Sequence, residues 1–197
     1  MTYAKKIKHG TLTLVVGPSG VGKDTLLDAA KAHFINDPAY HFPKRVITRQ
    51  SQTGEDHIPV NEESFANMRR DDRFLIDWRA HGLAYGIPVG VRSQLENGVC
   101  VVVNSSRQVI DLARERWPLV RVVHIVTDPN VLRQRLLQRG RETAEDVEQR
   151  VLRATQIKMA PDETRITIDN SKTLQDAIAS FIDGLKSVSA DDNAQAV

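Results

Sequence analysis

A glycine-rich loop near the start of the chain separates a short apolar run, residues 12–16, from a helix-forming run, residues 26–31. The loop reads Gly17-Pro18-Ser19-Gly20-Val21-Gly22-Lys23-Asp24-Thr25. It matches the pattern G-x-x-x-x-G-K-[ST] except at the last position, where Asp24 replaces a hydroxyl residue. Glycines let successive backbone N–H groups point at one anion, and the N-terminus of the following helix attracts negative charge. The sequence therefore predicts a strand, a phosphate-binding loop and a helix, in that order.

A simple turn between a strand and a helix needs only one or two glycines, whereas this loop has three at the spacing of the motif, together with a lysine. We therefore expect Lys23 to reach the β- and γ-phosphates of a nucleotide. Two interpretations of Asp24 stay open. Either its carboxylate holds Mg²⁺ directly or through water, or Asp24 is a first-turn residue favoured by the helix dipole and Thr25 supplies the oxygen ligand.

Composition indicates a single globular domain, alone or with inserted lids. Hydrophobic residues make up 41% and charged residues 26% of the 197 residues, which is ordinary globular usage and not disorder. The net charge of +2 argues against a general nucleic-acid binder. Cys100 is the single cysteine and lies in an apolar run, so we expect a core residue and neither a disulfide nor a zinc framework. Without a membrane-length apolar run or a signal-peptide core, we expect a cytoplasmic protein with no membrane partner.

Apolar runs alternate with helical patterns along the chain. The expected strands are residues 11–16, 45–49, 98–103, 121–126 and 164–168, with further strand material at 74–78 and 81–87. The expected helices are residues 24–34, 62–68, 107–116, 130–138, 144–159 and 174–185, and the polar stretch 50–59 is expected to be a loop. This alternation is typical of an α/β fold with a parallel sheet flanked by helices, whose ligands lie at the carboxyl ends of the strands. The glycine loop follows the first strand at such an end.

Arginines are concentrated in one part of the second half. They are Arg133, Arg135, Arg139, Arg141, Arg150 and Arg153. One interpretation is a solvated helix face on which they pair with nearby acidic residues. The other applies to at least Arg135, Arg139 and Arg150, which would contact phosphate from a mobile segment, because phosphoryl transfer depends on cations held in place. The sequence alone leaves both open.

Several of these motifs together resemble the guanylate kinase family, over about residues 11–185. They are the glycine loop, Ile47-Thr48-Arg49 with Gly54-Glu55, the helix at 63–65, Asp77-Trp78, the turn 82–86 with Tyr85, and Arg135-Leu136 with Arg139-Gly140. The resemblance implies a P-loop nucleoside-monophosphate-kinase fold that uses ATP and Mg²⁺. It also implies a core (about 11–46, 88–130 and 160–186), an acceptor-binding insertion (about 47–87) and a lid (about 131–159). Residues 187–197 are expected to be a disordered tail.

Two departures from the guanylate kinase pattern concern the acceptor. Guanylate kinases have a second arginine three residues after the one matched by Arg49, and here that position is Gln52, followed by a shortened loop at 55–58. They also have acidic residues near the positions of Asn104 and Ser105, one of which recognises guanine. A buried site without these partners would leave the N–H donors of guanine unpaired. We therefore do not expect guanine to be the acceptor.

The same segments are similar to those of the ribose 1,5-bisphosphate phosphokinases, guanylate-kinase-like enzymes of phosphonate catabolism. The similarity rests on Gly-Lys-Asp in the loop, residues 47–49 and 55–58, Trp78, residues 81–86, residues 103–107 and residues 135–142. It implies transfer of the γ-phosphoryl of ATP to the 1-phosphate of ribose 1,5-bisphosphate, which gives 5-phospho-α-D-ribose 1-diphosphate. The implied partners are therefore two small molecules, ATP and a sugar bisphosphate.

The resemblance implies a role for each candidate residue. Catalysis would use Lys23, Arg135, Arg139 and Arg150, the nucleotide would bind residues 17–25, and the metal would lie at Asp24 or Thr25. The acceptor would contact Arg45, Arg49, His57, Asp77, Tyr85, Asn104 and Arg107. Structural roles stay open for several of these: Tyr85 in the core, His57 facing solvent, Asp77 capping a turn, and Arg107 beginning a helix.

Two other functions are compatible with parts of the pattern. One is a nucleoside-monophosphate kinase with an altered base preference, which the missing guanine acids oppose. The other is a non-catalytic guanylate-kinase-like interaction module, which typically loses the phosphate loop and so is opposed by Lys23 and the lid arginines. Kinases of this kind often form homodimers, although the sequence carries no signature of a dimer interface.

Overall fold

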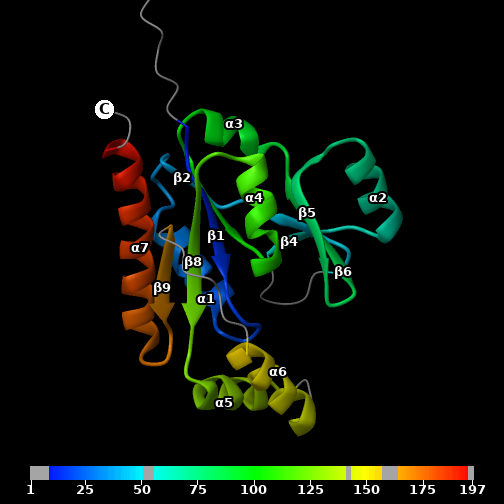
Figure 1. Cartoon of the computed structure of the whole chain (residues 1–197), viewed down its shortest axis with the longest axis vertical. Helices are drawn as coiled ribbons and strands as arrows, with labels where there is room; N and C mark the ends of the chain where they lie inside the picture. The colour runs from blue at the N-terminus through cyan, green and yellow to red at the C-terminus, as the bar shows by residue number, and fades with distance from the viewer. Residues whose placement is uncertain (1–8, 51–55, 141–142, 157–163, 195–197) are drawn as a thin grey trace, which may run out of the picture.

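The protein was studied as a computed structural model, which describes residues 9–50, 56–140, 143–156 and 164–194. The helices and strands follow one another in a single α/β arrangement (Figure 1). In chain order they are β1 (Leu12–Val16), α1 (Lys23–His33), β2 (Tyr40–His41), β3 (Arg45–Ile47), β4 (His57–Pro59), α2 (Glu62–Arg70), β5 (Phe74–Ala80), β6 (Leu83–Pro88), α3 (Val91–Glu96), β7 (Cys100–Asn104), η1 (Arg107–Val109), α4 (Ile110–Arg116), β8 (Val120–Val126), α5 (Pro129–Arg139), α6 (Ala144–Gln156), β9 (Arg165–Asp169) and α7 (Leu174–Ala194).

The main sheet has five strands in the order β2-β7-β1-β8-β9, and every pairing in it is parallel. The central strand β1 pairs on both sides, with Leu14 opposite Val103 of β7 and Val122 of β8. All five residues of β1 are buried, because neighbouring strands cover its edges and helices cover both faces. The predicted parallel sheet flanked by helices is confirmed.

Each face of this sheet has its own apolar cluster. On one face, α3, α4 and β5 pack against β1, β7 and β8 through residues such as Leu95, Ile110 and Trp117. On the other face, α1 and α7 pack through Leu26 and the fully buried Phe181. The carboxyl ends of the strands lie at the bottom of Figure 1, next to α5 and α6. Sheet topology therefore places the loop after β1, the end of β7 and the start of α5 at one edge.

A second sheet, in the order β4-β3-β6-β5, stands beside the first with α2 packed on it (Figure 1). Its core joins Val46, Phe65 and Ala84. Helix α2 begins where expected, because the Asn61 side chain accepts a hydrogen bond of 2.7 Å from the backbone N–H of Ser64. This sheet starts with β3 at Arg45, two residues before the expected start of the insertion.

Helices α5 and α6 form a separate pair held together by Leu132, Leu136, Val147 and Val151. The Asp128 side chain accepts a hydrogen bond from Asn130 N–H at the start of α5, and the helix ends at Gly140, whose φ is +60°. A small apolar cluster of its own connects this pair, in contrast to the large clusters on the main sheet. The pair coincides with the segment expected to be a lid.

Some elements differ from the expectation. Strands β2 and β4 and helix α3 were not predicted, because two to six residues are too few to show a period, and β4 lies in the stretch 50–59 expected to be a loop. Helix α7 continues to Ala194, so the backbone of the expected tail is helical up to that residue. Residues 195–197 and the predicted helical residues 157–159 lie outside the described ranges. In the part of the chain that the structure describes, no helix has the length and apolarity to span a bilayer.

Candidate active site

The phosphate loop is held from behind by a buried asparagine that follows β9. The Asn170 side chain is 2% exposed, and its Nδ2 donates a hydrogen bond of 2.8 Å to the carbonyl of Val21. At Gly22, whose φ is +99°, a Cβ atom would lie 2.4 Å from Asn170 Nδ2. A side chain at position 22 would therefore meet both backbone strain and a fixed amide. Asn170 was not predicted as a site residue. Its one signal in the sequence was its polar side chain two residues after a predicted strand, at the carboxyl edge of the sheet.

The same loop also supports the α5–α6 pair. A Cβ atom on Gly20, whose φ is +90°, would lie 2.8 Å from Leu136 Cδ2 of α5. From α6, an Arg150 Nη2 donates a hydrogen bond to Ser19 Oγ. Both helices of the pair therefore contact the phosphate loop, one by packing and one through an arginine.

Lys23 lies inside the loop, where its Nζ donates hydrogen bonds to the carbonyls of Gly17 (2.8 Å) and Pro18 (2.9 Å). The pKa of Lys23 is lowered to about 8, chiefly by burial; the negative charge of Asp24 opposes the shift, and the nearby positive charges of Arg45, Arg107 and Arg139 add to it. Four cations from distant parts of the chain thus converge on the loop. Such a concentration of positive charge favours a polyanionic ligand.

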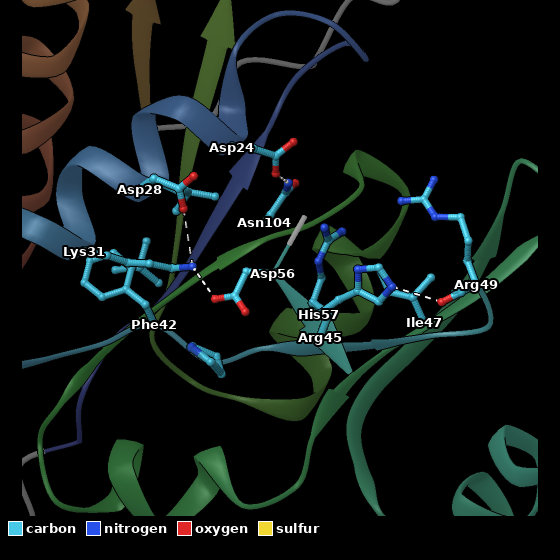
Figure 2. Close-up of a pocket in the computed structure, with 13 residues that line it drawn as sticks. Asp24, Asp28, Lys31, Phe42, Arg45, Ile47, Arg49, Asp56, His57 and Asn104 are labelled. Atoms are coloured by element: carbon cyan, nitrogen blue, oxygen red, sulfur yellow. Dashed lines mark hydrogen bonds and ion pairs between the residues drawn. The ribbon is translucent and has the colours of Figure 1, made fainter. Parts of the chain in front are cut away.

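Two adjoining cavities occupy the edge of the main sheet. The larger, of about 390 Å³, is lined by the phosphate loop, β3, the end of β7 and the tips of α5 and α6. The smaller, of about 90 Å³, lies between α1, β3 and β4 and is drawn in Figure 2. Five residues line both cavities: Asp24, Arg45, Ile47, Arg49 and Asn104. A ligand in one cavity would therefore meet a ligand in the other at this shared wall.

Asp24 and Asn104 are paired across the shared wall. Asn104 Nδ2 donates a hydrogen bond of 2.7 Å to Asp24 Oδ1, which joins the end of β7 to the first turn of α1 (Figure 2). The parallel pairing of β7 with β1 brings these residues together from positions 80 apart in the sequence. The amide holds Asp24 Oδ1 in place, and Asp24 lines both cavities, so its carboxylate can serve as an oxygen ligand for a cation.

An aromatic pair lines the larger cavity on the side of the second sheet. The rings of Trp78 and Tyr85 stack with centroids 5.3 Å apart and planes 9° apart, because the two residues are directly opposite in the β5–β6 ladder. The Arg45 guanidinium lies 5.7 Å from the centroid of the Tyr85 ring. Tyr85 thus lines the site, as expected, and also helps to hold Arg45 in it.

The structure brings most of the sequence-predicted residues to the two cavities. Those that line the larger one are Gly17, Ser19, Gly20, Gly22, Lys23, Asp24, Thr25, Arg45, Arg49, Tyr85, Asn104, Arg139 and Arg150. His57 lines the smaller one, and its Nε2 is 3.0 Å from the carbonyl oxygen of Arg49. Pro18 contributes a carbonyl to Lys23, whereas Val21 is a fully buried core residue.

Three predicted residues lie elsewhere. Asp77 lines neither cavity, because its Oδ2 pairs with Arg69 Nε of α2 at 3.2 Å. In the β5–β6 ladder Asp77 is opposite Gly86, so it alternates with Trp78, which faces the cavity. Arg107 is half-buried in η1, close enough to lower the Lys23 pKa, and Arg135 is partly buried on α5, but neither lines a cavity. Arg141, Gln52, Gly54 and Glu55 lie outside the described residues.

Sequence reasoning also missed most of the wall of the smaller cavity. On α1 the missed residues are Leu27, Asp28 and Lys31, which share one stripe of the helix with the predicted Asp24. The rest of the missed wall consists of Phe42, Pro43, Asp56 and Val102. The α1 residues follow the spacing i, i+3, i+4, i+7 of one helix face, which is a signal that the sequence did contain. In the larger cavity the missed residues are Ile47, Trp78, Ala80, His81, Ser105, Ser106 and Leu136.

The chain is similar to known proteins along most of its length. A family model described as guanylate kinase matches residues 9–187. The chain is 41% identical to ribose 1,5-bisphosphate phosphokinase PhnN of Agrobacterium fabrum, over 84% of this chain and 91% of that protein. It is 43% identical to the protein of the same name from Acidiphilium cryptum, over 89% of this chain and 92% of that one.

Other relatives are longer proteins whose names give two activities. The chain is 45% identical to a bifunctional ribose 1,5-bisphosphokinase-thymidine phosphorylase of Cupriavidus pinatubonensis, over 91% of this chain but only 30% of that protein. The corresponding protein of Roseobacter denitrificans is covered over 26% of its length. The chain therefore spans less than a third of these bifunctional relatives.

Solved structures support the fold. A guanylate kinase from Anaplasma phagocytophilum superposes with a TM-score of 0.59 at 16% identity, over 95% of this chain and 87% of that one. A gluconokinase from Sinorhizobium meliloti superposes with a TM-score of 0.55 at 18% identity, over 95% of this chain and 98% of that one. At this level of identity the likeness concerns the fold alone.

The close approach of Asn170 to Gly22 leads to a prediction about the stability of a variant at position 22. Replacing Gly22→Ala should lower the free energy of unfolding by about 1–3 kcal/mol through backbone strain, with a further loss from the contact with the Asn170 amide. The matched control is Gly90→Ala, because Gly90 has φ −58° and nothing within 4 Å of an added Cβ. Urea denaturation should find this control at least as stable as the unmodified protein. Equal stability of the two variants would contradict the role assigned to Gly22.

Proposed function

Because the chain belongs to the guanylate kinase family and, within it, to the ribose 1,5-bisphosphate phosphokinases, we propose that it phosphorylates ribose 1,5-bisphosphate with ATP. The product would be 5-phospho-α-D-ribose 1-diphosphate, formed together with ADP. One observation carries this proposal: the phosphate loop, the arginines of α5 and α6, and the arginines of β3 and its following loop all line connected cavities. Donor and acceptor phosphates can therefore meet at one wall.

The chemistry requires positioning more than it requires a base. An oxygen of the 1-phosphate attacks the γ-phosphorus of ATP, a new O–P bond forms, and the bond between the γ-phosphorus and the β,γ-bridging oxygen breaks to release ADP. The attacking oxygen is already anionic, so no proton has to be removed first. The protein must instead hold two polyanions in line and balance the charge of the transferred group.

The lysine and arginines around the cavities can be assigned to different phosphate groups by their positions. Lys23 and Arg150 contact the phosphate loop, so we assign them to the phosphates of ATP. Arg45 and Arg49 lie at the wall shared by both cavities, so we assign them to the attacking phosphate. Arg139 lies near Lys23 at the end of α5, where it can balance the charge of the transferred group. Under this proposal the α5–α6 pair is the lid.

The residues present fit a magnesium ion bound to the nucleotide. Asp24 and Thr25 supply a carboxylate and a hydroxyl at the phosphate loop, and Mg²⁺ in kinases is bound by few protein oxygens together with substrate phosphates. When bound, Mg²⁺ neutralises charge on the β- and γ-phosphates. Asn104 fixes the direction of the Asp24 carboxylate through its hydrogen bond to Oδ1.

The Asn104 contact also favours a sugar bisphosphate over guanine as the acceptor. A base with N–H donors needs acceptor groups from the protein, whereas the Asn104 amide uses an N–H on Asp24 and that carboxylate is directed at the phosphate loop. The remaining wall of the smaller cavity is formed by apolar side chains and charged groups from α1, β3 and β4. A non-catalytic interaction module would have no need for the buried Lys23 and the arginines around it.

Release of ADP tests the proposed reaction directly. With Mg²⁺ and ATP, the purified protein should turn over ribose 1,5-bisphosphate and not GMP, AMP or dTMP. The variant Lys23→Ala should lose activity by about 100- to 1,000-fold, because it removes a preorganised cation at the reacting phosphate. Lys172→Ala, at an exposed lysine, is the control for a change of charge alone. A preference for GMP would show that the protein is a divergent guanylate kinase.

The lowered pKa of Lys23 predicts how ATP binding depends on pH. The ammonium is protonated below its pKa of about 8, and the protonated form is the one that binds phosphate. As the pH rises above about 8 the free protein loses this proton, so the Kd for ATP should rise about tenfold per pH unit. Calorimetry between pH 7 and 9.5 measures this dependence, and Lys23→Met should not show it. A Kd for the unmodified protein that is constant over this range would contradict the assignment.

The two interpretations of Asp24 can be separated by nucleotide binding. If Asp24 contacts the metal, Asp24→Asn should lose most of the extra thermal stabilisation that Mg²⁺ adds to ATP, while stabilisation by ATP with EDTA is kept. The matched control is Asp28→Asn, which removes the same charge one turn later on the same face of α1. An unchanged effect of Mg²⁺ in Asp24→Asn would make Asp24 a helix-dipole residue and leave Thr25 as the ligand.

A further inference from the structure

The smaller cavity continues away from the phosphate loop along one face of α1. Asp24, Leu27, Asp28 and Lys31 line it in succession. Seven residues separate the first from the last, which corresponds to a rise of about 10 Å along the helix axis. The cavity therefore reaches from the wall where the two phosphates react to a second, distant end at Lys31.

The distant end of the cavity already holds two anionic groups beside Lys31, the carboxylates of Asp56 and, at 3.6 Å, of Asp28. Lys31 Nζ is 3.0 Å from Asp56 Oδ2, and Figure 2 shows this contact across the cavity. On the other side, Lys44 Nζ is 2.7 Å from Asp56 Oδ1. Hydrogen bonds from the two lysines hold the pKa of Asp56 below its ordinary value, so the carboxylate is ionised. The position next to Lys31 is thus one that stabilises a negative oxygen.

The cations around the cavity differ in what they can reach. Arg45 and Arg49 line both cavities and are committed by the proposed reaction to the attacking phosphate. Among the described residues, Lys31 is the one lysine or arginine that lines the smaller cavity but not the larger one. Its side chain is 32% exposed, so it has room to change partners. Asp56 would keep Lys44 when Lys31 turns away. Asp28, whose Oδ1 is 3.6 Å from Lys31 Nζ, would lose this partner, but its side chain is 63% exposed, so water screens its charge.

A sugar bisphosphate carries its two phosphates on opposite sides of one furanose ring. With the 1-phosphate at the shared wall, the 5-phosphate must lie away from the phosphate loop, and the smaller cavity extends in that direction. We infer, on the premise of the proposed function, that the distant end of this cavity is the subsite for the 5-phosphate and that Lys31 binds it in exchange for Asp56. Lys31 thereby selects acceptors that carry a second phosphate.

The test compares two acceptors, ribose 1,5-bisphosphate and ribose 1-phosphate, which lacks the group in question. In Lys31→Met the ratio of kcat/KM for the first acceptor to that for the second should fall by about 10- to 100-fold, the effect expected for one lost charge-assisted contact. Lys31→Arg should restore most of the ratio. Lys172→Met is the control, because Lys172 is an exposed lysine that lines neither cavity, and it should leave the ratio unchanged.

Binding of ribose 5-phosphate gives a second readout that does not depend on turnover. Its Kd, measured by calorimetry, should rise about 10- to 100-fold in Lys31→Met and stay unchanged in Lys172→Met. An unchanged ratio of kcat/KM together with an unchanged Kd in Lys31→Met overturns the assignment, as does an equal loss on both acceptors. A failure of the proposed function itself is seen separately, because the unmodified protein would then use neither sugar.

Discussion

The buried amide of Asn170 donates a hydrogen bond to the carbonyl of Val21 and approaches Gly22 so closely that no side chain fits there. Through this contact the end of β9 fixes the backbone from which Lys23 and α1 start. The opposite side of the same loop supports Leu136 of α5. The phosphate loop therefore contacts the end of β9 on one side and α5 on the other and leads directly into α1, so a displacement of the loop would move α1 and α5 with it.

Charge is distributed unevenly in a chain whose net charge is only +2. Lysines and arginines from four separate segments gather around the two cavities, while carboxylates at Asp24 and Asp56 stand among them. The carboxylates limit the repulsion between these cations before substrates arrive. Each has its own kind of partner: Asp24, at the phosphate loop, accepts a hydrogen bond from an amide, and Asp56, at the far end of the smaller cavity, pairs with two ammonium groups.

The loop, the parallel sheet and most helices could be predicted from the sequence, because continuous apolar strands and the phosphate-loop motif are local signals. The direction of Asp77 could not, since it depends on which residue of β6 lies opposite in the ladder. Asn170 contacts Val21 across 149 positions of the sequence, and no local pattern reports such a contact. Lys31 did lie on a readable helix face, but only the packing of β3 and β4 beside α1 turned that face into a cavity wall.

Two arginines of the α5–α6 pair, Arg139 and Arg150, are placed near the phosphate loop in different ways. Arg139 is the last residue of α5, and Leu132 and Leu136 of the same helix pack against Gly20. The packing of α5 on the loop therefore sets the position of Arg139. Arg150 belongs to α6, which among the described residues is joined to α5 by a small cluster of four buried side chains. Substitutions of its α6 members, Val147 and Val151, should therefore raise the entropic cost of positioning Arg150, while Leu132 and Leu136 still hold Arg139 in place.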